Sequence, residues 1–377
     1  MLKLFSTQKG KEGIFGLDIL RAISVIIILI THSRFIFPNN VEFNNIIKYF
    51  FVDVVTVFFV LSGFLIGTIL IKLCEHSKVD FKLLLNFWKR RWLRTIPVYV
   101  TILSIALILT KWLNPSFSIL AHSHYYIFSQ NLATIHPPFF LEAWSLSIEE
   151  WFYIITPLCI FCLILIGKIN TKNATLIIAI LLITVITSFR AYRFLNLNVT
   201  PSLDVFFFAF RMQVITRLDS LMYGIIGAWL YVYYPTKWPQ HKLFWFILGL
   251  VILWVNRVYG EFNLHISNDF YTYVFSCAID SAATLALLPY LTSIKKSKSY
   301  FGQGLTFISV ISYSLYLIHN AIVIQIILPK VGDFMEFSSY RLTFALKHLF
   351  FWVSTLVLSF LSYKLIEEPI NKLREKH

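Results

Sequence analysis

The sequence predicts an all-α integral membrane protein, a polytopic bundle of about ten transmembrane helices with both termini in the cytoplasm. Two observations support this fold class. The 377 residues are 58% hydrophobic and only 14% charged, which is more apolar and less charged than a soluble globular domain. The apolar residues also fall into repeated stretches of about twenty, the length with which a helix crosses a bilayer.

Ten such stretches are the predicted membrane spans. They cover residues 14–35, 46–72, 95–113, 146–166, 174–190, 216–234, 243–259, 271–292, 305–328 and 342–365. No internal repeat and no low-complexity linker divides the chain. We therefore expect residues 1–377 to form a single membrane domain with a short cytoplasmic tail at each end.

The net charge of +14 follows the topology of these spans. Lys and Arg cluster before the first span, at the C-terminus and in alternate links, namely residues 72–94, 168–172, 237–242 and 295–298. The link 114–144 contains neither residue type. Because basic links stay on the cytoplasmic side, this pattern predicts that both termini are inside. It explains the basic excess as a topology signal, so we expect a lipid bilayer and no nucleic acid as partner.

Three polar residues in the first span are candidate functional groups. Arg21 and His32 are eleven residues apart, about three helical turns, and Asp18 precedes Arg21 by three residues, so all three share one helix face. A charge inside a bilayer is costly and marks a functional site by default. Histidine titrates near neutral pH, which suits His32 as a general base near the outer end of the span. The alternative is an interfacial histidine that only makes hydrogen bonds.

The fourth span begins with two adjacent carboxylates. Ser147 and Glu150 have the spacing of a capping box, so Glu150 is predicted to complete a helix N-terminus. Glu149 has no such role, and it enters the membrane at the outer level of His32. We therefore predict that the Glu149 carboxylate orients or polarises the His32 imidazole.

Two arginines mark the cytoplasmic entry to the third span. Arg91 and Arg94 are three residues apart and so lie on one helix face. Guanidinium groups bind phosphate oxygens in pairs, which suits a phosphorylated cytoplasmic cofactor. The alternative is ordinary positive-inside charge.

Two outer segments are more than simple links. Residues 114–144 are aromatic and contain three histidines, which fits either a partly buried loop or an interfacial aromatic belt. Residues 191–215 and their flanks carry charges on the predicted outer side, namely Arg190, Arg193, Asp204, Arg211, Arg217 and Asp219. These residues either snorkel from helix ends or bind an anionic acceptor headgroup.

Other polar residues in the spans have weaker signals. His319 in the ninth span and Asp280 in the eighth fit internal hydrogen bonding better than catalysis. The sequence has no metal-ligand cluster at a recognisable spacing, no Gly-rich phosphate loop and no nucleophile elbow. We therefore expect no metal cofactor.

Six short motifs occur in a fixed order along residues 14 to about 370. They are Arg21 with His32; the stretch Phe58 to Ile66; Arg91 and Arg94 with Pro97; Ser147, Glu149, Phe152 and Tyr153; Arg217, Asp219 and Gly224; and Ser312 to His319. With these motifs the chain resembles the acyltransferase 3 family of multi-pass membrane acyltransferases. It departs from that pattern twice, with Thr56 where the family has Asp and with Glu367-Glu368-Pro369 where the family has Glu-Arg-Pro.

The resemblance implies an acyl-CoA donor, commonly acetyl-CoA, used from the cytoplasmic side of a bacterial inner membrane. It implies a carbohydrate acceptor, either a surface polysaccharide such as lipopolysaccharide or a lipid-linked sugar. His32, assisted by Glu149, would deprotonate the acceptor hydroxyl, with Asp18 and Arg21 lining the passage for the pantetheine arm. Arg91 and Arg94 would hold the phosphates of the cofactor.

The remaining motif residues are candidates for binding the acceptor. They are Tyr153, Arg211, Arg217, Asp219 and His319. Two other functions stay open, a transporter or exporter of acyl or sugar-linked substrates and a non-catalytic scaffold, because intramembrane charges also mark transport paths. The acceptor sugar, the acyl length, a covalent intermediate and the oligomeric state are not specified by the sequence.

Overall fold

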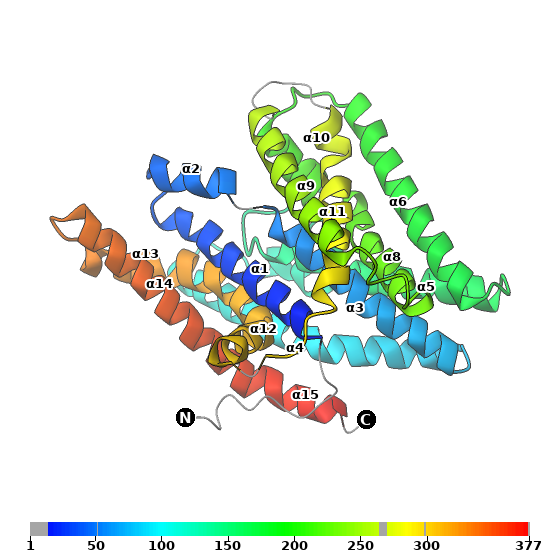
Figure 1. Ribbon diagram of the computed structural model, residues 1–377. Helices are drawn as coiled ribbons and strands as arrows, with labels where there is room; N and C mark the ends of the chain where they lie inside the picture. Colours follow the sequence, from blue (N-terminus) through cyan, green and yellow to red (C-terminus); the bar gives the residue numbers. More distant parts are fainter. Residues whose placement is uncertain (1–13, 51, 264–269, 298, 376–377) are drawn as a thin grey trace.

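The computed structural model describes residues 14–50, 52–263, 270–297 and 299–375, and these residues form helices with no strand among them. The longer helices are α1 (Phe15–Ser33), α3 (Val54–His76), α4 (Phe81–Leu113), α5 (Ala143–Leu165), α6 (Thr171–Leu195), α8 (Asp219–Tyr233), α9 (Lys242–Asn263), α11 (Ser276–Leu291), α12 (Tyr300–Ile318) and α14 (Tyr340–Ser362). Each predicted span overlaps one of them, so the all-helical class is confirmed (Figure 1).

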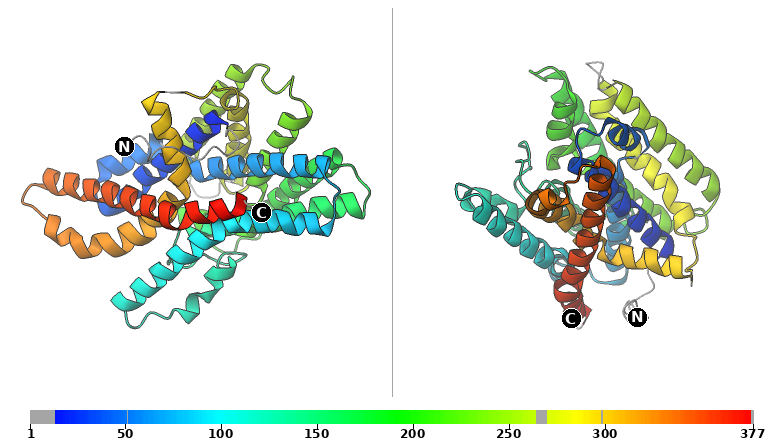
Figure 2. Two further views of the ribbon diagram at one scale, coloured as in Figure 1. Left: turned by 90° about the horizontal axis from the view of Figure 1, so that it is seen from below. Right: turned by 90° about the vertical axis from the view of Figure 1, so that its left-hand side faces the viewer.

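Shorter elements connect these helices. They are η2 (Arg34–Ile36), α2 (Val41–Phe50), η3 (Leu120–Ile127), α7 (Leu203–Val205), η4 (Phe206–Arg211), η5 (Val214–Thr216), α10 (Phe270–Val274), η6 (His319–Ile327), α13 (Leu328–Val331), η7 (Gly332–Met335), η8 (Tyr363–Glu367) and α15 (Glu368–Glu375). Helix α15 packs against α4, far away in the sequence (Figure 2).

Within the described residues, eight helices are long and apolar enough to cross a membrane, against the ten that the sequence predicts. The difference concerns α8 and α11, which have 15 and 16 residues. A helix needs about twenty residues to span the hydrocarbon core. Both short helices are largely buried among their neighbours rather than exposed around their circumference.

Two predicted boundaries are corrected by the structure. Helix α4 begins at Phe81 rather than near residue 95, because Asp80 caps it by accepting a hydrogen bond from the Leu83 amide at 2.7 Å. Most of the basic link is therefore the first part of a 33-residue helix. Helix α3 begins at Val54 rather than at residue 46, again behind a capping Asp, and the preceding residues form the separate helix α2.

Helices α3 and α8 approach each other through two glycines. A Cβ on Gly63 would lie 2.0 Å from the carbonyl oxygen of Leu221, and one on Gly224 would lie 2.2 Å from that of Val60. Small residues allow such close backbone packing between membrane helices. This contact explains why Gly224 of the fifth motif is a glycine.

We expect Gly224→Ala to push α3 and α8 apart and to destabilise the protein by about 1–3 kcal/mol, the usual effect of overpacking. Thermal unfolding in detergent measures this. Gly260→Ala is the matched control, because a Cβ there meets no atom within 4 Å. Equal melting temperatures for the two variants would contradict the close contact.

The segment 114–144 folds into the protein as a partly buried loop. Tyr125, Asn131 and His136 are buried, and burial lowers the pKa of His136 to about 4, so this ring is uncharged at neutral pH. The Asn131 amide donates to the carbonyl oxygens of Trp144 at 3.0 Å and Met212 at 2.6 Å. The loop thereby ties the start of α5 to η4 and η5.

Candidate active site

A cavity of about 830 Å³ lies on the side of the bundle that the charge pattern predicts to face outward. It is bordered by the end of α1, the starts of α3 and α5, and the segment around η4. Polar side chains in its wall include His32, Asp53, Glu142, Arg211, Tyr316 and Asn320. The cavity is large enough for a sugar-sized ligand.

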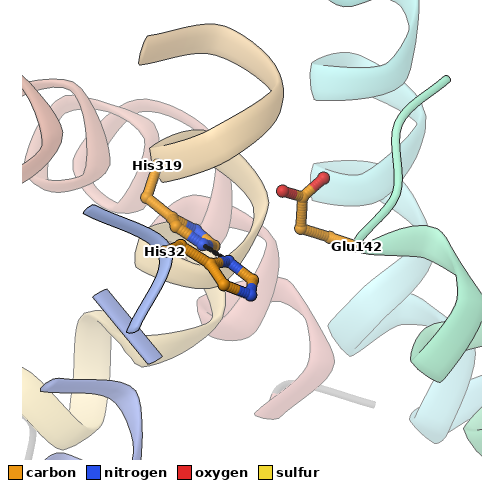
Figure 3. Close-up of side chains that lie close together, drawn as sticks. All are labelled: His32, Glu142 and His319. Carbon is orange, nitrogen blue, oxygen red and sulfur yellow. Dashed lines mark hydrogen bonds between the residues drawn. The ribbon is translucent and has the colours of Figure 1, made fainter. Parts of the chain in front are cut away.

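His32, in the last turn of α1, is paired with His319. The His32 Nδ1 atom lies 2.7 Å from His319 Nε2, and the rings are nearly coplanar, with centroids 5.0 Å apart and planes 16° apart (Figure 3). This is the geometry of an in-plane N–H···N hydrogen bond. His319 is fully buried and begins the π-helical segment η6, a distortion often found at functional sites.

The contacts of His319 assign the proton positions of both rings. His319 Nδ1 lies 3.0 Å from the carbonyl oxygen of Leu315, which can only accept, so Nδ1 carries the proton. In the neutral ring Nε2 is then the acceptor, and His32 Nδ1 must be the donor to it. The lone pair of a neutral His32 is thus on Nε2, the nitrogen that a general base needs free.

The carboxylate near this pair belongs to Glu142, immediately before α5 (Figure 3). One carboxylate oxygen of Glu142 and one ring nitrogen each of His32 and His319 lie within 4.8 Å of one another. Glu142 carries no functional signal in the sequence, because a carboxylate ahead of a helix is usually explained by the helix dipole alone. Its position on the loop that folds inward brings it to the histidines.

Glu149 lies elsewhere, about two helical turns further along α5 than Glu142. It accepts a hydrogen bond from the Tyr153 hydroxyl at 2.9 Å and lies 4.0 Å from the Arg91 guanidinium. The predicted contact between Glu149 and His32 is therefore replaced by one with Tyr153 and Arg91. Arg91 also donates to the Tyr153 hydroxyl, and it lies 4.0 Å from the centre of that ring.

Asp18 and Arg21 share one face of α1, as predicted. They lie 3.4 Å apart, and both contact the Ser309 hydroxyl of α12 at 3.1 Å. Arg21 also lies in the neighbourhood of Arg91, Glu149 and Tyr153. We call Asp18, Arg21, Arg91, Glu149 and Tyr153 the inner cluster. It lies toward the predicted cytoplasmic side of His32, whereas Arg94 is exposed one turn beyond Arg91 on α4.

The predicted capping box at Ser147 and Glu150 is wrong. Helix α5 begins at Ala143, so both residues lie inside it. The Ser147 hydroxyl donates to the carbonyl oxygen of Ala143, and Glu150 accepts from the Thr95 hydroxyl of α4 at 2.8 Å. Glu150 is structural, as predicted, but through a contact between helices.

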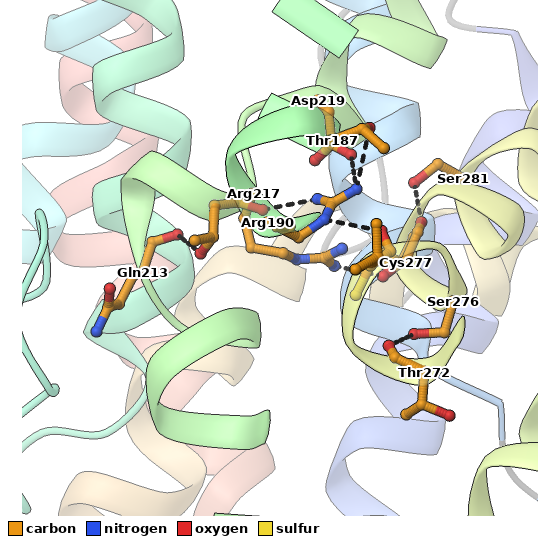
Figure 4. A network of polar contacts seen from close by, with 12 residues as sticks. Thr187, Arg190, Gln213, Arg217, Asp219, Thr272, Ser276, Cys277 and Ser281 are labelled. Atoms are coloured by element: carbon orange, nitrogen blue, oxygen red, sulfur yellow. Dashed lines mark hydrogen bonds and ion pairs between the residues drawn. The ribbon is translucent and has the colours of Figure 1, made fainter. Parts of the chain in front are cut away.

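The arginines around residues 190–217 point into the protein rather than snorkelling outward. Arg190 and Asp219 form a buried ion pair of 2.7 Å (Figure 4). Arg217 is fully buried and donates to the Thr56 hydroxyl at 2.6 Å. Of the charged residues around this segment that could bind the acceptor, Arg211 and Asp204 border the cavity.

Arg211 is held by Asp53, the residue that caps α3. Two guanidinium nitrogens donate to the two carboxylate oxygens at 2.7 and 3.1 Å. Although burial opposes it, the Arg211 guanidinium holds the pKa of Asp53 well below its usual value. Asp53 also accepts from the Thr56 hydroxyl at 2.9 Å. Asp53 therefore links Thr56 to Arg211.

Comparison with known proteins gives the family. The model of the acyltransferase domain matches residues 14–364. O-acetyltransferase OatA of Staphylococcus aureus (strain NCTC 8325 / PS 47) is 29% identical over 379 residues, which cover 95% of this chain and 57% of that protein. Putative O-acetyltransferase SACOL0978 of Staphylococcus aureus (strain COL) is 26% identical over 393 residues, covering 98% and 59%.

The chain thus spans less than two thirds of the length of these curated relatives. No solved structure matches it. The family model covers nearly all the described helices and both members of the histidine pair. This chain, a helical membrane protein, belongs to the acyltransferase 3 family.

Proposed function

We propose that the chain is a membrane O-acyltransferase, specifically an O-acetyltransferase. It takes the acyl group from acyl-CoA at the cytoplasmic face of a bacterial inner membrane and gives it to a hydroxyl of a cell-surface or lipid-linked carbohydrate. The observation that carries the proposal is the hydrogen-bonded pair of His32 and His319, with His32 in the wall of the outer cavity. The relatives, an O-acetyltransferase and a putative O-acetyltransferase, support acetyl as the acyl group.

The histidine pair supports His32 as the general base. Its Nε2 takes the proton from the acceptor hydroxyl, and the hydroxyl oxygen attacks the carbonyl carbon of the thioester. The C–S bond breaks as the new C–O bond becomes an ester. The imidazolium then gives its proton to the CoA thiolate. His32 is neutral again, and the products are the ester and the CoA thiol.

The inner cluster supports a path for the donor from the cytoplasmic side. Its two guanidinium groups, those of Arg21 and Arg91, lie between the cytoplasmic ends of the helices and His32. Because Arg94 is exposed whereas Arg91 is partly buried, we assign the CoA phosphates first to Arg94. Asp18, Arg21, Arg91, Glu149 and Tyr153 then line the passage of the pantetheine arm.

The outer cavity supports a polar, ring-shaped acceptor. Its wall combines aromatic rings, such as Trp144 and Tyr316, with the amides of Asn256 and Asn320 and with Arg211. Aromatic faces with a few convergent polar groups are typical of small-molecule sites. We therefore propose Arg211 as an acceptor-binding residue. Arg217, Asp219 and His319 do not border the cavity, and we propose that they support the residues that do.

A transporter is the second candidate, because charged clusters inside membrane spans also mark transport paths. Proteoliposomes given acetyl-CoA with a radiolabelled acetyl group separate the two functions. A transferase consumes the thioester: free CoA thiol appears, and label enters alkali-labile esters when carbohydrate acceptor is supplied. A transporter moves label into the lumen as intact thioester, and this outcome would overturn the proposal.

A further inference from the structure

Glu142 is a buried carboxylate that makes no ion pair among the described residues. It is 2% exposed, and the donors near it, the Asn320 amide and the backbone N–H groups of Glu142 and Ala321, are neutral and make no hydrogen bond of ordinary distance and angle to it. The nearby cation on the cavity wall, Arg211, is bound by both oxygens of Asp53. Burying such a group without a partner is costly, and burial raises the pKa of Glu142 to about 7.

The surroundings of Glu142 offer it a positively charged partner when one of the two histidines becomes protonated. Its carboxylate comes within 4.8 Å of the ring nitrogens of both His32 and His319. In the neutral pair these rings are satisfied by each other and by the Leu315 carbonyl. Protonation of His32 Nε2 adds a full positive charge to the pair, in a buried place where charges interact strongly.

We propose, on the basis of the acyl transfer proposed above, that Glu142 is the counter-charge of the histidine pair and stabilises the imidazolium that forms when His32 deprotonates the acceptor. The acceptor proton moves to His32 Nε2. The His32 Nδ1–H is shared with His319 Nε2, and the positive charge spread over the two rings faces the Glu142 carboxylate. Glu142 is thus a positioning residue that acts through His32.

The same three side chains are of the types that bind zinc, and the geometry favours the proton role. Two nitrogen ligands at about 2.05 Å in a tetrahedral site lie about 3.3 Å apart. The observed N···N distance of 2.7 Å is that of a hydrogen bond. His319 also keeps a proton on Nδ1 for the Leu315 carbonyl, which fixes the tautomer that the pair requires.

Glu142→Gln tests the proposal, because it removes the charge and keeps the size. The full chain in nanodiscs is given acetyl-CoA, and free CoA is followed by its thiol. We expect kcat to fall about 100-fold with KM unchanged, and Glu142→Asp to recover part of the loss. The melting temperature should stay level or rise, because the variant removes an unpaired buried carboxylate.

Several outcomes would overturn the proposal. They are unchanged kcat in Glu142→Gln, a melting temperature that falls together with activity in both variants, and inactivation by a chelator that zinc reverses. Glu75→Gln, at a carboxylate in the last turn of α3, is the control. A wild-type protein that releases no CoA would instead refute the proposed function, and the melting temperatures would still test whether Glu142 is a structural residue.

Discussion

His32→Ala is expected to lower acyl transfer at least 100-fold, the usual contribution of a general base. The side chain that borders the cavity and is oriented by His319 would be gone, while the inner cluster would be untouched. Binding of acetyl-CoA should therefore persist. The measurement uses membranes that contain the variant and radiolabelled acetyl-CoA, with label counted in the alkali-labile carbohydrate fraction, and acetyl-CoA binding measured on purified protein.

The matched control is His76→Ala, at an exposed histidine in the last turn of α3. It should transfer label like the wild type. Normal transfer by a folded His32→Ala protein would contradict the assignment of the base. Loss of acetyl-CoA binding together with transfer would instead place His32 in the donor path.

Asp219→Ala is expected to destabilise the protein by about 3–5 kcal/mol, because it leaves the buried Arg190 charge without its carboxylate. Arg190 would keep only its bonds to the carbonyl oxygens of Val274 at 2.9 Å and Thr216 at 2.7 Å and a bond to Thr187. Thermal unfolding in detergent measures the loss, and the activity of the remaining folded protein should be close to that of the wild type.

The double variant Arg190→Met with Asp219→Leu is the control, since replacing both charges of a buried pair by apolar groups is often neutral. It should recover most of the lost stability. If Asp219→Ala instead abolished transfer at an unchanged melting temperature, Asp219 would be a substrate-binding residue, as the motif alone predicts.

The sequence predicted the helical class, the position of each long helix, and the shared face of Asp18 and Arg21, because these depend on hydrophobic length and helical period. It misplaced the starts of α3 and α4. Those starts are set by single capping Asp residues, and the first part of α4 mixes apolar residues with Lys and Arg, so it does not have the composition of a membrane span.

The partner of His32 could not be predicted from local pattern. Glu149 and Glu142 are seven residues apart, two turns of one helix face, so the spacing does not choose between them. The choice depends on the depth at which α1 packs against α12 and η6, and on the loop 114–144 folding inward. Both are contacts between residues far apart in the sequence, such as the hydrogen bond between His32 and His319.

The proposed function requires that this protein consumes an acyl-CoA thioester through His32. Slow hydrolysis of acetyl-CoA by the purified chain in nanodiscs tests it most directly, because water replaces the unidentified acceptor. We expect CoA release by the wild type and by His76→Ala, and none above background by His32→Ala. Equal release by wild type and His32→Ala, or no release and no binding of acetyl-CoA by the wild type, would contradict it.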